Sequence, residues 1–322
     1  MKRRVASLLL VVFGLFLLCL LAVLVFRDAG AKRSAALGLD FPTVMAHRGA
    51  SFWAPEEMEI AYRLAQATQV DFLEADIQRS QDGVLLALHD DTLERTTNVG
   101  QVFPQRAHRP VSDFTWAELS QLDAGSWFNH RYPDRARTGF VGAKLLPLER
   151  LIDVALSLDK PTGLYLETKS PERFPGLEQQ LVAQLARRGY TEMPGKIVFQ
   201  SFSADSLRHL ARLAPSVPRI YLISEEMVKE QGFDRLLSVA QQIAQGIGPV
   251  GYYAYPTHNY RAHRRGLVVH TWTVNLGWQL RLLRLFGADG VFTDRCDLAM
   301  PIWKHKPARS IESLWQATQR RF

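Results

Sequence analysis

The stretch LEADIQRSQDGVLLALHDDTLERTT, residues 73–97, is the most informative part of this chain. Side chains alternate across a strand, so Glu74 and Asp76 project from one face of a strand over 71–78. The Asp82-Gly83 pair is typical of a tight hairpin turn, and the return strand brings His89 back beside the two carboxylates. The segment therefore predicts a strand hairpin that carries two acids and a histidine to one edge of a sheet.

Strand-like runs alternate with amphipathic runs along the rest of the chain. We expect strands at 44–48, 71–78, 164–168, 196–200, 219–223, 248–252, 267–273 and 290–293, and helices at 56–67, 148–158, 172–188, 204–213, 225–245 and 276–286. Eight such units over about 250 residues predict an α/β fold, the (β/α)8 or TIM barrel, with its chemistry at the C-terminal ends of the strands. The segment at about 91–147, after the hairpin, is too long for a single connecting loop, so it is predicted to be an insertion in the barrel.

Polar residues fall at those strand ends. Glu74, Asp76 and Glu167 are hard oxygen ligands suited to Mg²⁺ or Ca²⁺, which predicts a divalent cation as cofactor. Arg48 and Lys169 supply positive charge for an anionic group, with fork geometry from the arginine. The alternative is that the three acids are rim residues in salt bridges with these two cations.

The first part of the chain predicts a membrane anchor. Residues 5–26 are 22 positions without a charge behind Met-Lys-Arg-Arg, long enough to span a bilayer as one transmembrane helix. A cleaved signal peptide is the competing interpretation, but its apolar region is shorter, at about 7–15 residues. We therefore divide the chain into an anchor (1–27), a linker (28–40), the barrel (41–300) and a C-terminal tail or helix (301–322). The basic start favours a single-pass protein with its N-terminus in the cytoplasm and the barrel outside.

Net charge and cysteine content limit the classes of binding partner and the disulfides that the chain can have. The formal charge of +7 comes from dispersed basic residues without a nucleic-acid-binding motif, so we expect no nucleic acid and expect anionic lipid headgroups nearby. The sequence indicates no protein partner. Cys19 lies in the apolar segment and Cys296 near the far end, so no intrachain disulfide is expected.

Nine short motifs, in order, resemble the glycerophosphodiester phosphodiesterase family of phospholipase-C-like barrels. They are HRG (47–49), Pro-Glu (55–56), LEAD (73–76), QDG with LALHD (81–90), LERTT (93–97), LETK (166–169), FQSF (199–202), HTWTVN (270–275) and GADGVFTD (287–294). The family usually reads Pro-Glu-Asn-Thr where this chain has Pro55, Glu56, Glu57 and Met58. Glu56 is therefore a candidate site residue that also fits a helix start, and Glu57 is a candidate change in the substrate or metal environment.

The resemblance implies a metal-dependent hydrolase with His47 and His89 as its acid–base pair and with Arg48 and Lys169 holding the phosphate. In the family a glycerol hydroxyl attacks the neighbouring phosphate and expels the alcohol, and water then opens the cyclic phosphate. The expected substrates are small glycerophosphodiesters, which give glycerol 3-phosphate and an alcohol. Two alternatives stay open: a lysophospholipase D acting on membrane lysolipids, and a non-catalytic membrane-bound barrel that binds phosphorylated headgroups.

Aromatic residues have two interpretations each. Trp272, at a strand end, either floors the pocket under glycerol or packs the top of the barrel. The aromatic residues of the insertion either receive an acyl chain or, as we favour, form the small core of the insertion; they are Phe103, Trp116, Trp127 and Phe128. The other histidines lack acidic company and are expected to be structural or on the surface.

Overall fold

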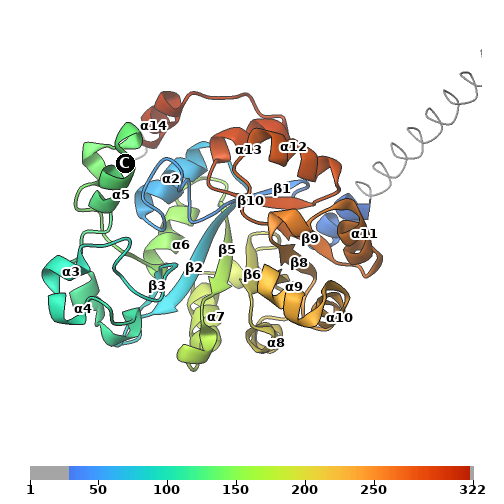
Figure 1. Ribbon diagram of the computed structural model, residues 1–322, viewed down its shortest axis with the longest axis horizontal. Coiled ribbons are helices and arrows are strands. Elements are labelled where there is room, and N and C mark those ends of the chain that lie inside the picture. The colour runs from blue at the N-terminus through green and yellow to red at the C-terminus, as the bar shows by residue number, and fades with distance from the viewer. Residues whose placement is uncertain (1–28, 320–322) are drawn as a thin grey trace, which may run out of the picture.

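Eight parallel strands close into a barrel in the computed structural model, which describes residues 29–319 (Figure 1). They are β1 (Thr43–Ala46), β2 (Phe72–Arg79), β5 (Gly163–Thr168), β6 (Ile197–Ser201), β7 (Arg219–Ile223), β8 (Gly246–Pro249), β9 (Val268–Thr271) and β10 (Gly290–Thr293). Neighbours pair in that order, and β1 pairs with both β10 and β2, which closes the sheet. The predicted TIM barrel is confirmed.

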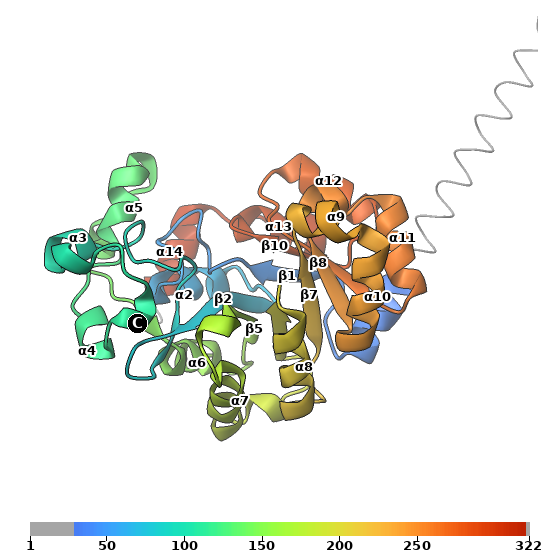
Figure 2. The ribbon, with the colours of Figure 1, turned by 60° about the horizontal axis from the view of Figure 1, so that its bottom comes forward.

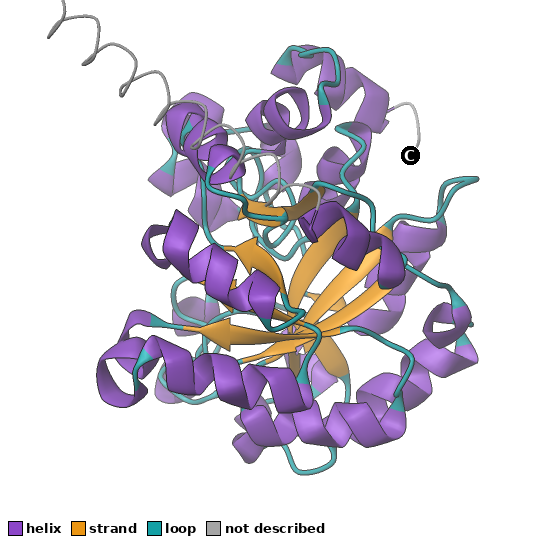
Figure 3. Ribbon diagram, turned by 90° about the vertical axis from the view of Figure 1, so that its right-hand side faces the viewer, coloured by secondary structure: helices purple, strands orange, loops and turns teal. Residues whose placement is uncertain are grey.

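Helices surround the strands on the outside of the barrel (Figure 3). They are α2 (Glu59–Ala67), α6 (Leu148–Leu156), α7 (Leu177–Arg187), α8 (Ala204–Leu213), α9 (Glu225–Gln231), α10 (Phe233–Ile243), α11 (Pro256–Arg264), α12 (Gly277–Leu285), α13 (Cys296–Lys304) and α14 (Ile311–Gln319). Short 3-10 turns η5 (Pro171–Arg173), η6 (Tyr190–Glu192) and η7 (Gly251–Tyr253) lie in the connections. Because the strands are buried on both faces, they read as continuous apolar runs.

Several predicted boundaries are wrong, each for a local reason. The single helix expected at 225–245 is two helices, α9 and α10, because Gly232 between them has φ of 78°. The helix expected from residue 172 begins after Gly176, whose φ is 81°. The strand expected at 248–252 lies at Gly246–Pro249 instead and ends at a proline, which cannot donate to the ladder.

The hairpin after β2 is confirmed. Strand β3 (Leu85–Ala87) runs antiparallel to β2, with Ile77 opposite Ala87, and β4 (Leu146–Pro147) adds to β3. Between β3 and β4 the insertion forms α3 (Val99–Val102), α4 (Trp116–Leu119), α5 (Ser126–Arg131) and the turns η1 (Pro104–Arg106), η2 (Val111–Asp113), η3 (Pro133–Arg135) and η4 (Thr138–Phe140). These elements form a lobe at one side of the barrel (Figure 2).

The aromatic residues of the insertion pack mainly on one another and on the barrel core, as the favoured interpretation predicted. Phe128 is fully buried, and its ring lies 5.5 Å from that of Phe140 and 4.9 Å from that of Tyr132. Phe103 packs 5.8 Å from the buried Phe114. These contacts bury apolar surface within the lobe itself.

The predicted anchor, residues 5–26, lies outside the described residues. Within 29–319 no helix is long and apolar enough to cross a bilayer. The stretch assigned to the linker is helical over 29–36, and Leu39 packs on Met45 and Phe72 inside the barrel. At the other end, α13 and α14 account for most of the predicted C-terminal tail.

Candidate active site

A cavity of about 180 Å³ opens at the C-terminal ends of the barrel strands. Its lining residues are His47, Arg48, Glu74, Asp76, His89, Glu167, Lys169, Gln200, Phe202, Leu222, Trp272 and Phe292. The structure thus brings together every predicted site residue except Glu56, from strands far apart in the sequence. Glu56 is not among the lining residues and contacts Arg48 at one side.

The HRG motif makes a tight turn directly after β1. Arg48 and Gly49 have φ of 54° and 85°, and a Cβ on Gly49 would come within 2.8 Å of Ala61. Only glycine fits such a position without strain. The turn aims His47 and Arg48 at the cavity, and the Arg48 backbone N–H donates to Glu74 Oε2 at 2.8 Å.

Three carboxylates form one cluster in the floor of the cavity. Glu74, Asp76 and Glu167 each offer an oxygen within 4.8 Å of the others, and all three are buried. Gln200 donates to Glu74 Oε1 at 2.8 Å, whereas the buried Asp76 Oδ2 accepts no hydrogen bond from the part of the chain that the structure describes and faces Arg48 Nε at 3.3 Å. Hard oxygen donors at this spacing, one of them with a spare lone pair, fit a divalent cation.

The pKa values of this cluster diverge. Burial and the charge of Asp76 raise the pKa of Glu74 to about 7, and the same two causes raise the pKa of Glu167 well above its usual value. For Asp76, burial acts to raise the pKa, but Lys169 and Arg48 outweigh it and hold the pKa below its usual value. Like charges in one pocket disfavour full ionisation, and a bound cation relieves that repulsion.

The two predicted phosphate-binding cations lie against the same carboxylates. Arg48 Nε is 3.3 Å from Asp76 Oδ2, and Lys169 Nζ is 3.6 Å from Asp76 Oδ1 and 3.4 Å from Glu167 Oε1. These are the ion pairs of the rim interpretation. Both cations also line the cavity, however, so their charges face a space that an anion could occupy.

Each histidine of the predicted pair is held by a carboxylate at Nδ1. His47 Nδ1 lies 2.7 Å from Asp294 Oδ1, and His89 Nδ1 lies 2.7 Å from Asp90 Oδ1. Asn275 in turn donates to Asp294 Oδ2 at 2.6 Å. Burial and Arg48 act to lower the pKa of His47, but Asp294 outweighs them and the pKa is raised. Each pair fixes the ring and leaves Nε2 for proton transfer.

These two carboxylates are not among the predicted site residues, although the sequence carries a signal for both. Asp90 directly follows His89, and Asp294 ends the GADGVFTD motif at the tip of β10. In a closed barrel β10 lies next to β1. An acid at the end of β10, such as Asp294, is therefore expected to lie near His47 at the end of β1.

Glu56 lies in the loop before α2, so the helix-start interpretation of this residue is wrong: the helix begins at Glu59. Its carboxylate accepts from Arg48 Nη1 at 2.9 Å and from Arg95 Nη1 and Nη2 at 2.9 and 2.7 Å. Arg95 also donates from Nε to Asp90 Oδ2 at 2.5 Å. One continuous network therefore joins Arg48 to Asp90, the carboxylate that contacts His89.

Glu57, at the position where the family usually has asparagine, is buried beneath the cluster. Its φ is 62°, a left-handed conformation uncommon outside Gly, Asn and Asp. Glu57 Oε1 accepts the Asp76 backbone N–H at 3.0 Å, and the Tyr62 hydroxyl donates to Oε2. Burial, followed by the charges of Asp76 and Glu74, raises the pKa of Glu57 well above its usual value.

Trp272 lines the cavity wall, with Nε1 donating to the Gly248 carbonyl at 2.6 Å and its ring edge-on to Phe202. The histidines away from the site are buried in the fold or exposed, as predicted, but the expectation that they lack acidic partners is wrong for two of them. His263 Nε2 lies 2.7 Å from the buried Asp289 Oδ2, and His108 Nδ1 lies 2.7 Å from Glu94 Oε1. His270 is fully buried inside the barrel, where Tyr165 Oη lies 2.9 Å from its Nδ1, and burial lowers its pKa to about 4. His108, by contrast, is exposed.

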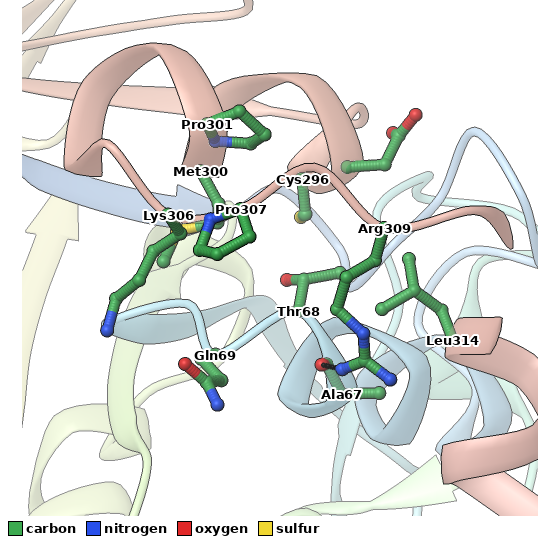
Figure 4. Close-up of a pocket in the computed structure, with 11 residues that line it drawn as sticks. Ala67, Thr68, Gln69, Cys296, Met300, Pro301, Lys306, Pro307, Arg309 and Leu314 are labelled. Carbon is green, nitrogen blue, oxygen red and sulfur yellow. Dashed lines mark hydrogen bonds between the residues drawn. The ribbon is translucent and has the colours of Figure 1, made fainter.

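A second cavity, of about 190 Å³, lies in the outer wall between the end of α2, α13 and the segment leading to α14 (Figure 4). The Arg309 side chain lines this cavity, and its Nη1 donates to the Ala67 carbonyl at 2.9 Å. Cys296 borders it, but burial raises the pKa of this thiol well above its usual value, which keeps it in the unreactive protonated form. This wall cavity has no histidine among its lining residues.

Comparison with known proteins agrees with this geometry. Residues 47–298 match the model of the glycerophosphoryl diester phosphodiesterase family. The chain is 36% identical over 301 residues to a glycerophosphodiester phosphodiesterase of Bacillus subtilis (strain 168), covering 92% of this chain and 97% of the relative.

Solved structures give the same result. A glycerophosphodiester phosphodiesterase from Agrobacterium tumefaciens str. C58 is 25% identical with a TM-score of 0.60, covering 80% of this chain and 98% of the other. A phosphodiesterase of Oleispira antarctica, solved with its product sn-glycerol-3-phosphate, is 27% identical with a TM-score of 0.61, covering 79% and 93%. The fold and site define a phosphodiesterase barrel, and the chain belongs to the glycerophosphoryl diester phosphodiesterase family.

Proposed function

We propose that this protein hydrolyses small glycerophosphodiesters to glycerol 3-phosphate and an alcohol by acid–base catalysis between His47 and His89. The observation that carries the proposal is the convergence of these histidines, two cations and three carboxylates on one small cavity. The product bound to the Oleispira antarctica relative supports the choice of substrate class.

Within this proposal the two histidines exchange protons at Nε2. One takes the proton from the attacking hydroxyl, and the other gives a proton to the leaving alcohol oxygen. Asp294 and Asp90 hold the two rings at Nδ1, which sets the tautomer that each ring needs. Arg48 and Lys169 bind the nonbridging phosphate oxygens and offset charge that develops on them.

Glu74, Asp76 and Glu167 would hold one divalent cation, Mg²⁺ or Ca²⁺. When bound, that ion supplies charge neutralisation at the phosphate. Gln200 and the Arg48 N–H orient the two oxygens of Glu74, which keeps this carboxylate aimed at the cluster.

The size of the cavity favours a small headgroup diester over a lysolipid. At about 180 Å³ the cavity falls below the roughly 300–1,000 Å³ that is usual for drug-sized ligands. Phe128 of the insertion is buried in its own lobe and is not available to an acyl chain. A non-catalytic headgroup receptor is disfavoured because both histidine–carboxylate pairs are intact.

The proposal includes an anchored, single-pass protein with its barrel outside the cytoplasm. It rests on the sequence of residues 5–26 and the basic residues before them. Fractionation of cells that express the full chain, followed by carbonate extraction and protease treatment of intact cells, tests both points.

The test of the activity uses the full chain in detergent with glycerophosphocholine and lysophosphatidylcholine. His47→Ala and His89→Ala should each lower kcat by about 10²–10⁴-fold, the range for losing a positioned acid or base. His108→Ala, at an exposed histidine, is the matched control. Normal turnover in either cavity variant, or a kcat/KM that is higher for the lysolipid, would overturn the proposal.

A further inference from the structure

The segment 254–288, which contains α11, β9 and α12, is uniformly basic. It carries five arginines and three histidines and no aspartate or glutamate. Two of the arginines on α11 and in the turn after it, Arg261 and Arg265, pair with Asp234 of α10. Arg264 and Arg281 are exposed. This side of the barrel therefore presents positive charge to solvent.

The same side also exposes apolar side chains that do not pack into the barrel core. Leu280 and Leu283 of α12 are buried against the protein. The opposite face of that helix carries large apolar side chains in solvent, starting in the loop before it: Leu276 (51% exposed), Trp278 (61%), Leu282 (37%) and Leu285 (52%). Positions 278, 282 and 285 share one helix face. An apolar stripe with arginine beside it marks an interaction surface.

The described chain begins on this side of the molecule. Arg33, in the helical stretch 29–36, donates to the His263 carbonyl of α11, and Asn259 of α11 donates to the Phe286 carbonyl at the end of α12 at 2.9 Å. The two helices lie next to each other in Figure 1. The 22 uncharged residues at 5–26 are therefore joined to the barrel close to the basic and apolar face of α11 and α12.

We propose that the α11–α12 face docks on the surface of a bilayer that contains anionic phospholipid. Trp278 and the exposed leucines enter the headgroup–acyl boundary, where tryptophan is favoured. Arg264 and Arg281 meet the lipid phosphates, to which basic residues near an anionic surface are attracted. A second copy of this chain is a poorer occupant, because it would set two basic faces against each other.

Docking along α12 fixes the orientation of the barrel. The helix starts just after Trp272, a residue of the catalytic cavity, and runs toward the opposite end of the barrel. Contact along its length lays the barrel on its side, with Leu276 and Trp278 at the headgroup–acyl boundary. The mouth of the cavity then lies beside the membrane surface.

The test uses full chain reconstituted in vesicles of phosphatidylcholine with phosphatidylglycerol, some of it brominated in the acyl chains to quench tryptophan. Trp278→Phe should remove most of the bromine-dependent quenching. Trp116→Phe, in the insertion lobe on the other side of the barrel, should leave it unchanged (Figure 2). Vesicles of phosphatidylcholine alone should quench less, as should the double variant R264Q/R281Q.

Three results would overturn the proposal. The first is quenching that Trp278→Phe does not change, and the second is quenching that is equal with and without anionic lipid. The third is a stable dimer of the full chain in detergent that Leu282→Ser and Leu285→Ser disrupt, because that result assigns the face to a second copy. Hydrolysis of glycerophosphocholine in detergent, measured in the same variants, reports separately on the catalytic site and should stay unchanged.

Discussion

Arg95 donates two parallel hydrogen bonds, of 2.9 and 2.7 Å, to the carboxylate of Glu56, which is 39 positions away in the sequence. Neither residue lines the candidate catalytic cavity. Glu56 also holds Arg48, and Arg95 also holds Asp90, the partner of His89. The ion pair therefore connects the start of the insertion both to Arg48 and to the Asp90–His89 pair. Fork-to-fork pairing fixes direction as well as distance.

Breaking this pair should disturb the chemistry without unfolding the barrel. We expect Arg95→Gln to lower kcat/KM about 10- to 100-fold, the range for partners that orient active-site groups. KM should rise because Arg48 loses its support, and kcat should fall because Asp90 is no longer fixed. Arg95→Lys keeps the charge but not the fork, so it should recover only part of the loss.

Arg150 provides a matched control, because it makes the same two-bond contact with Glu59 away from the cavity and is similarly exposed, at 47% against 44% for Arg95. Arg150→Gln should leave both kinetic constants unchanged. An equal loss in the two variants, with matching circular dichroism, would mean that Arg95 acts on general stability rather than on the site.

The pH dependence of the reaction should depend on Asp294. This carboxylate raises the pKa of His47 against the opposing effects of burial and Arg48. Asp294→Asn removes the charge, so the pKa of His47 should fall and the limb of the kcat/KM profile that reports it should move to lower pH. Asp205→Asn, at an acid 84% exposed on α8, should leave the profile in place. An unmoved limb in Asp294→Asn would show that His47 is not the titrating group.

Removing single carboxylates from the cluster should weaken metal binding. We expect Glu74→Gln, Asp76→Asn and Glu167→Gln each to raise the Mg²⁺ or Ca²⁺ concentration for half-maximal activity at least about 10-fold. The measurement is a metal titration after EDTA treatment, with binding followed by calorimetry. Glu118→Gln, in the insertion, is the control. A wild-type titration in all three variants would place the cation elsewhere.

The barrel was predictable because its signals are local and repeated. Each strand is a short apolar run, and Asp82-Gly83 specifies the hairpin through the turn alone. The site followed from the fold, since residues at strand ends must converge when a parallel sheet closes. This reasoning needs only the strand order, so it placed Glu74 and Glu167 together although 93 positions separate them in the sequence.

The features that could not be predicted from the sequence depend on backbone conformation and on contacts between loops. The apolar periodicity continues across Gly232, and only the left-handed backbone there separates α9 from α10. Glu56 fits a helix start by its neighbours, yet the loop from Pro55 to Met58 folds over the HRG turn, where the Glu57 N–H donates to the Arg48 carbonyl at 3.1 Å. No local pattern encodes that contact, nor the one between Arg95 and Glu56.

Glu57 gives a prediction about stability. Burial, Asp76 and Glu74 raise its pKa in the folded protein, so the folded state holds a proton that the unfolded chain releases at about pH 4.3. The stability that this group contributes is present below that pH and is lost as the pH rises toward the folded pKa, by at most about 1.4 kcal/mol per pH unit. Glu57→Gln keeps an acceptor for the Asp76 N–H and cannot ionise.

In EDTA, the free energy of unfolding of Glu57→Gln relative to wild type, measured from pH 5 to pH 8, should therefore increase with pH until Glu57 ionises in the folded protein. The same trend, with a larger offset from altered packing, is expected for Glu57→Asn, which restores the residue that the family usually has. Glu172→Gln, at an exposed carboxylate, should show no trend. Denaturant unfolding at each pH measures the difference, and a constant value across this range would show that Glu57 is already ionised in the folded protein at low pH.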